Sequence, residues 1–158
     1  SYERAAREEP NNIWYTVNQI DVLLDMGRKQ EALVVVERAT EIAPDFATVW
    51  ARKGQVLRRL RRYEDAVIAY DRAVELDPKY AWAWNGRGLC LLALERYDDA
   101  LICYKQAVQH EASDVWFWHN YGETLLRMGD KDAAREIFKR ALEIDPDHQS
   151  TKDKLNGL

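Results

Sequence analysis

The chain has 158 residues, of which 47% are hydrophobic and 11% aromatic, enough to bury the core of one domain. A formal net charge of −4 excludes the strong positive field that draws proteins to nucleic acid or to anionic membranes. The sequence also lacks an uninterrupted apolar run of the roughly 20 residues that a membrane-spanning helix needs.

In chain order, residues 1–12 come first and read SYERAAREEPNN. They align with the later stretch 70–80, so that Tyr2 corresponds to Tyr70 and Ala5 to Ala73. That later stretch ends an apolar-periodic helix. Residues 1–12 are therefore expected to be the remnant of a helix whose partner lies upstream, in a longer protein.

Four pairs of apolar-periodic segments follow between residues 13 and 148, each segment about 14 residues long. Polar turns are predicted within the pairs at residues 27–28, 61–62, 95–96 and 129–130. The later segment of a pair, such as YEDAVIAYDRAVEL at 63–76, spaces apolar residues at i, i+3, i+4 and i+7, as a half-buried helix requires. The last residues, QSTKDKLNGL at 149–158, are polar and predict a short capping helix.

The same residue types recur at intervals of 34 residues along these pairs. They are Pro10, Pro44, Pro78 and Pro146; Trp50, Trp84 and Trp118; Gly54, Gly88 and Gly122; and Ala32, Ala66, Ala100 and Ala134. Gly88 is expected to let two helices approach closely, with Tyr104 filling the space beside it. Gly86 has no glycine at the equivalent positions, so we expect it on the helix surface.

A 34-residue period that carries these residues in this order resembles the tetratricopeptide repeat. The resemblance implies an all-α fold, an α-α superhelix in which antiparallel helix pairs form a right-handed solenoid. It divides the chain into a remnant at 1–12, repeats at 13–46, 47–80, 81–114 and 115–148, and a capping helix at 149–158.

In this family the first helix of each repeat faces the ligand, which assigns a set of candidate peptide-binding residues here. These are Trp14, Asn18, Asp21, Arg52, Gln55, Arg59, Trp82, Asn85, Trp116, His119, Asn120, Glu123 and Arg127. The large aromatic side chains indicate binding, because exposed aromatic clusters mark interaction sites. They are equally consistent with simply covering the neighbouring first helix.

Charge is uneven along the repeats. Residues 47–80 carry eight Lys or Arg against five acids, whereas residues 13–46 carry three against six. Arg52 and Arg59 lie seven residues apart on one helical face and could together hold an acidic side chain or a peptide carboxylate. The alternative is that this basic edge pairs with acids of the first repeat.

The sequence does not indicate catalysis, a cofactor or a metal site. His110, His119 and His148 lie in different parts of two repeats without an i, i+4 partner. Cys90 and Cys103 fall inside apolar helical patterns, which favours buried thiols and a reduced, cytoplasmic setting.

These features favour a non-catalytic protein-interaction scaffold that binds a peptide or partner helix. Two alternatives stay open: the substrate-recruiting arm of an enzyme such as a transferase, whose catalytic domain lies outside this sequence, and a helical-repeat RNA reader. The second requires a basic concave surface, which Asp21, Asp25 and Glu123 interrupt. An uncapped N-terminal helix would also promote self-association.

Overall fold

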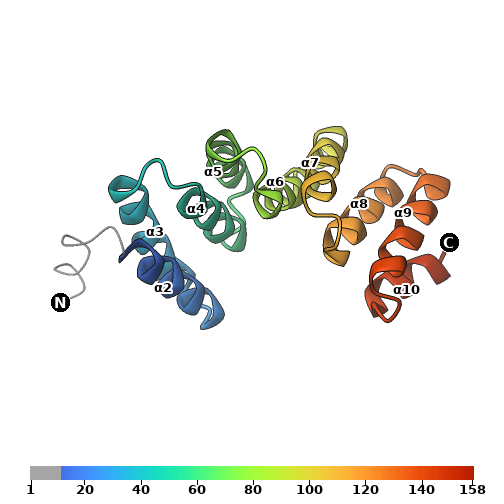
Figure 1. Cartoon of the computed structure of the whole chain (residues 1–158), viewed down its shortest axis with the longest axis horizontal. Helices are drawn as coiled ribbons and strands as arrows, with labels where there is room; N and C mark the ends of the chain where they lie inside the picture. The colour runs from blue at the N-terminus through green and yellow to red at the C-terminus, as the bar shows by residue number, and fades with distance from the viewer. Residues whose placement is uncertain (1–11) are drawn as a thin grey trace. The chain divides into compact units, whose positions relative to one another are not determined.

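The computed structural model describes residues 12–158, which divide into two compact units between Pro78 and Lys79. The first unit contains α2 (Ile13–Asp25), α3 (Lys29–Ile42), α4 (Ala47–Arg59) and α5 (Tyr63–Leu76). The second contains α6 (Ala81–Ala93), α7 (Tyr97–His110), α8 (Val115–Arg127), α9 (Lys131–Ile144) and α10 (Gln149–Asn156). All regular structure in residues 12–158 is helical, which confirms the all-α prediction (Figure 1). The predicted remnant at 1–12 falls outside this range, apart from Asn12.

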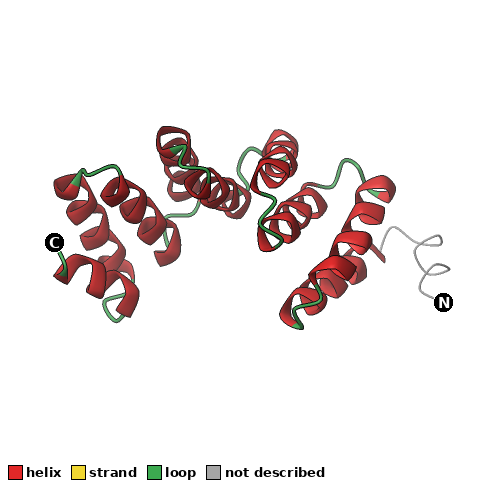
Figure 2. Ribbon diagram, turned by 180° about the vertical axis from the view of Figure 1, so that it is seen from behind, coloured by secondary structure: helices red, strands yellow, loops and turns green. Residues whose placement is uncertain are grey.

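Within each unit the helices pack as antiparallel pairs, α2 with α3 and α4 with α5, then α6 with α7 and α8 with α9 (Figure 2). Each pair turns at the residues predicted from the sequence, with one residue in the left-handed region: Gly27, Arg61, Glu95 and Gly129. The next amide in each turn donates to a leucine carbonyl of the first helix, as Arg28 N does to Leu23 O at 2.8 Å. This bond satisfies a carbonyl that would otherwise be unpaired at the end of the helix.

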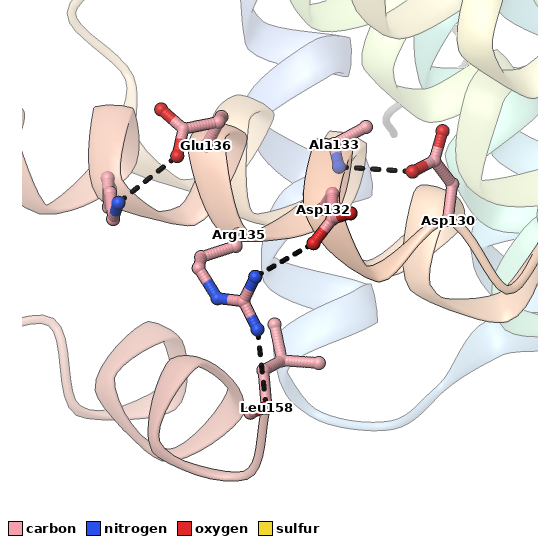
Figure 3. Close-up of polar contacts among 7 residues, drawn as sticks. Asp130, Asp132, Ala133, Arg135, Glu136 and Leu158 are labelled. Atoms are coloured by element: carbon pink, nitrogen blue, oxygen red, sulfur yellow. Dashed lines mark hydrogen bonds and ion pairs between the residues drawn. The ribbon is translucent and has the colours of Figure 1, made fainter.

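Acidic side chains stabilise the start of the second helices. Arg62 donates to Asp65 at 2.8 Å and Arg96 to Asp99 at 2.7 Å, both in the first helical turn. At α9 the Asp130 carboxylate instead accepts from the backbone N–H of Ala133 at 3.1 Å (Figure 3). Acids near a helix N-terminus are favoured because they satisfy free N–H groups and oppose the helix dipole.

Close packing in three of the pairs depends on a glycine opposite an aromatic ring. A Cβ added at Gly54 would lie 2.7 Å from the Tyr70 ring, and one at Gly88 would lie 2.8 Å from the Tyr104 ring. A Cβ at Gly122 would lie 2.6 Å from the Phe138 ring. These distances are too short for real contacts, so the prediction that Gly88 serves packing is confirmed.

The prediction that Gly86 lies on the helix surface is wrong, because Gly86 is buried. Residues at the equivalent position explain why. Arg52 forms an ion pair with Asp21 of the preceding first helix, and Asn120 donates a hydrogen bond to Asn85 of the preceding first helix. This position therefore belongs to a packed face of the helix. The predicted burial of Cys90 and Cys103, in contrast, is confirmed.

Candidate functional site

The candidate residues fall into two groups, one in each unit. The N-terminal patch lies on α2 and α4 and consists of Trp14, Asn18, Asp21, Arg52, Gln55 and Arg59. The C-terminal patch lies on α6 and α8 and consists of Trp82, Asn85, Trp116, His119, Asn120, Glu123 and Arg127. Within each unit the two first helices touch, α2 against α4 and α6 against α8, so the candidate residues of each patch lie on neighbouring helices.

An ion pair joins the two helices of the N-terminal patch. Arg52 Nε lies 2.8 Å from Asp21 Oδ1, and Arg52 Nη2 donates to Asp21 Oδ2 at 3.1 Å. This two-point contact fixes the guanidinium plane against α2. For Arg52, the structure favours the alternative that the basic edge pairs with an acid of the first repeat. Arg59, near the end of α4, is exposed.

An aromatic side chain is displayed at the other end of the N-terminal patch. The Trp14 ring meets the Phe46 ring edge-on, with centroids 5.2 Å apart and an interplanar angle of 89°. Trp14 nevertheless remains 55% exposed, and the neighbouring Asn18 is exposed as well. The contact with Phe46 fixes the indole while leaving much of its surface open to a ligand.

In the C-terminal patch, several candidate residues are used for packing. Asn120 Nδ2 donates to Asn85 Oδ1 at 3.0 Å and joins α8 to α6. Asn85 and His119 are buried, so the expectation that they line an open groove is wrong. Asn85 is covered because it lies on the side of α6 that meets α8.

His119 is covered by the C-terminal helix. Its Nδ1 lies 2.9 Å from Thr151 Oγ1 of α10, and His148 Nδ1 lies 2.6 Å from the same oxygen. The two imidazole rings are 5.4 Å apart, and the ring of Trp116 meets His148 edge-on at 4.4 Å. Two histidines that the sequence placed in different parts of the repeats therefore form one cluster.

A second contact with α10 involves Glu123. Lys154 Nζ lies 2.8 Å from Glu123 Oε2, and Arg127 Nε donates to Oε1 at 3.2 Å. Burial by itself would raise the pKa of Glu123, but the hydrogen bonds from Lys154 and Arg127 outweigh it and hold the pKa below its usual value. Burial lowers the pKa of His119, as does the nearby His148, with Glu123 opposing the change.

Thr151 and Lys154 were not among the candidate residues, although the 34-residue period contains a signal for them. Lys154 is one period after Asn120 and three periods after Arg52. Arg52 pairs with Asp21 in the same way that Lys154 pairs with Glu123. The register of the first helices therefore continues into α10.

Metal-binding and membrane-spanning features are both missing from the part of the chain that the structure describes. Residues 12–158 contain no group of three or more His, Cys, Asp or Glu side chains placed to hold a metal ion. None of the helices in this range is both long and apolar enough to cross a membrane.

Two family models, both described as tetratricopeptide repeat, match residues 45–110 and 91–153. Together they span more than half of the sequence, and they overlap in the third repeat. The chain belongs to the tetratricopeptide repeat family.

Solved structures of other proteins share this tetratricopeptide repeat fold. MamA from Desulfovibrio magneticus RS-1, from residue 41 to its end, is 23% identical with a TM-score of 0.78, and the match covers 90% of this chain and 81% of that one. PilF of Pseudomonas aeruginosa is 22% identical with a TM-score of 0.86, covering 92% and 66% of the two chains. TTC0263, a thermophilic TPR protein of Thermus thermophilus, is 23% identical with a TM-score of 0.84, covering 99% and 86%. No curated protein sequence matches the chain.

Proposed function

We propose that this chain is a non-catalytic interaction scaffold whose N-terminal patch binds an extended peptide or a partner helix. The observation that carries the proposal is the combination of a fixed, exposed Trp14 with an exposed Arg59 on the adjacent first helix. Tryptophan and arginine are among the residue types most enriched in protein-binding hot spots, and here they lie at opposite ends of one patch.

The two anchors imply the chemistry of the ligand. An apolar side chain of a peptide would cover the open part of the Trp14 indole, and the exposed Asn18 amide would bond to its backbone. An acidic side chain or a terminal carboxylate would pair with Arg59. Arg52 would support the site by holding α4 against α2, since Asp21 already occupies its guanidinium.

Selection of peptides from a random display library on the wild-type chain tests this proposal. Peptides recovered at low salt should be enriched in an aromatic or aliphatic residue with an acid several residues away, and should bind more weakly as salt is raised. Arg59→Ala should weaken them several-fold, whereas Arg38→Ala on α3, which lies outside the patch, should not. Recovered peptides that bind the Arg59→Ala variant as tightly as wild type would show that the patch is misassigned.

We also propose that the chain self-associates through its N-terminal end. This end comprises the expected helix at residues 1–12, which lies outside the described residues except for Asn12, and the face of α2 that this helix would adjoin. Tyr15 and Val22 are 70% and 55% exposed, whereas the equivalent Val49 and Val56 of α4 are fully buried. A second copy presenting the same face would cover both residues in a two-fold symmetric contact. Light scattering should then give a mass that rises with concentration for wild type and stays monomeric for Val22→Lys. Val34→Lys, at an exposed aliphatic residue of α3, is the control. A monomeric wild type at all concentrations would refute this contact.

A further inference from the structure

Helix α10 is held to α8 and α9 by few contacts. It has eight residues, of which only Thr151 is buried. Lys154 pairs with Glu123, and Arg135 Nη2 donates to the carbonyl oxygen of Leu158 at 3.3 Å (Figure 3). Leu155 and Leu158 pack against the cluster of Leu125, Ala134 and Phe138. Because this apolar contact is small, the polar contacts have a large share in holding α10 in place.

The Thr151 hydroxyl lies between two imidazole rings, and this limits their protonation. A hydroxyl has one hydrogen, so Thr151 can donate to one ring and must accept from the other. His148 Nε2 is buried with no hydrogen-bond partner in residues 12–158. An N–H there would have no acceptor, so His148 carries its proton on Nδ1 and donates to Thr151. Thr151 then donates to Nδ1 of His119.

Adding a proton to His119 disrupts this chain of bonds. On His119 the proton would turn the Nδ1 acceptor into a donor, and Thr151 would lose its only acceptor in the cluster. A buried donor left unsatisfied costs more than an ordinary hydrogen bond contributes.

Most of the charged or titratable groups around the cluster disfavour protonation of His119, and Glu123 is the exception. His148 in the loop before α10 and Lys154 on α10 both disfavour a positive charge on His119, while Glu123 on α8 favours one. Helix α9 contributes the apolar ring of Phe138, 5.8 Å from the His119 ring. Glu123 is already engaged by Lys154 and Arg127, so it offsets the other effects only in part.

We propose that α10 is a pH-gated cap: protonation of His119 in the His119–Thr151–His148 cluster releases α10 from α8 and α9 and uncovers His119 and Glu123. Release of the helix is independent of the function proposed above. The further step, that the uncovered C-terminal patch then takes a ligand, rests on that proposed function.

The direction of the pH effect follows from proton linkage. The pKa of His119 in the folded chain is lowered from the ordinary value of 6.5, mainly by burial, so the released state binds a proton more readily than the docked state. Docking of α10 is therefore at full strength above pH 6.5 and weakens as the pH falls below that value.

Amide NMR spectra of the full chain between pH 7.5 and 5.0 (about the range in which histidine titrates) test the gate without any ligand. We expect the amides of residues 149–156 to lose their helical shifts below pH 6.5, together with the titration of the His119 ring protons, while α6 and α7 stay unchanged. In His119→Gln the loss should disappear or move, and in His110→Gln, which changes an exposed histidine of α7, it should persist.

A wild-type α10 that remains helical at the low end of this range would overturn the proposal. So would a transition that persists unchanged in His119→Gln. Because the spectra report on α10 directly, a chain that opens but binds no peptide would contradict only the ligand step.

Discussion

Each patch has an ion pair at equivalent positions of the 34-residue period, but the consequences of the two pairs differ. Arg52 on α4 pairs with Asp21, and Lys154 on α10 pairs with Glu123. Arg52 belongs to α4, the first helix of a full repeat, and α4 leaves Trp14 and Asn18 of α2 exposed. Lys154 belongs to a short helix that covers His119. The comparison teaches that α10 imitates the first helix of a further repeat and contacts His119 and Glu123, as α4 contacts Asp21.

The aromatic side chains at the second position of each repeat show the same contrast. Trp14 and Trp116 are almost equally exposed, at 55% and 52%. Trp14 rests on the apolar ring of Phe46, whereas Trp116 rests on the two imidazoles beneath α10. The exposed fraction of a tryptophan therefore does not by itself distinguish a ligand-binding residue from one that packs beside α10. The residues that the tryptophan ring contacts do distinguish them.

Core packing also differs between the two ends, and it provides the largest expected effect. Ile20 and Val36 in the first pair occupy the positions that Gly122 and Phe138 occupy in the last pair. Gly122→Leu should push α8 away from α9 and reduce the free energy of unfolding by about 1–3 kcal/mol or more. Combining it with Phe138→Val imitates the first pair and should restore part of the loss. Denaturant unfolding measures both, and a fully stable Gly122→Leu chain would show that the two pairs do not differ in this way.

Removing the hydroxyl between the two histidines should have a smaller effect, confined to the C-terminal end. Thr151→Val keeps the shape of the side chain but deprives His119 and His148 of their shared partner, at a cost of about 1–3 kcal/mol. We expect α10 to become sensitive to proteolysis while the N-terminal patch is unaffected. Ser150→Ala, at the exposed neighbouring residue, is the control. Equal protease resistance in both variants would argue against the cluster as the main lock.

The smallest expected effect is the difference in unfolding free energy between two arginine substitutions in the N-terminal patch. Arg52→Ala leaves Asp21 without its partner and should reduce the free energy of unfolding by about 1 kcal/mol or less, since the pair is partly solvated. Arg59→Ala should stay within about 0.5 kcal/mol of wild type. Thermal unfolding monitored by circular dichroism compares them. A larger loss for Arg59→Ala would mean that Arg59 is the structural residue.

Much of the fold was predictable from the 34-residue period. Gly88, Tyr104 and the turn at residues 95–96 each follow from a repeated local requirement, namely close approach, volume and chain reversal. Such requirements act within one helix pair, so a single sequence reveals them.

The site was less predictable, because it depends on what lies against each first helix. Gly86 and His119 appeared exposed when each repeat was considered alone, and both are covered in the fold. The contacts between α10 and α8 were not predicted for the same reason. Residues 149–156 lack the tryptophan and glycine of a repeat, so the sequence offers little reason to expect that Lys154 and Thr151 contact α8. Their role depends on Glu123 and His119, which lie about one 34-residue period earlier.

We predict that a peptide binds the N-terminal patch and not the C-terminal patch. The most direct test measures the dissociation constant of one library-selected peptide for two matched variants at neutral pH. Trp14→Ala should weaken the peptide by about tenfold or more, as expected for an aromatic anchor. Trp116→Ala should leave its dissociation constant within about twofold, because α10 covers His119 beside Trp116. A peptide that tolerates Trp14→Ala but is lost with Trp116→Ala would contradict the account, since the covered patch would then be the one that binds.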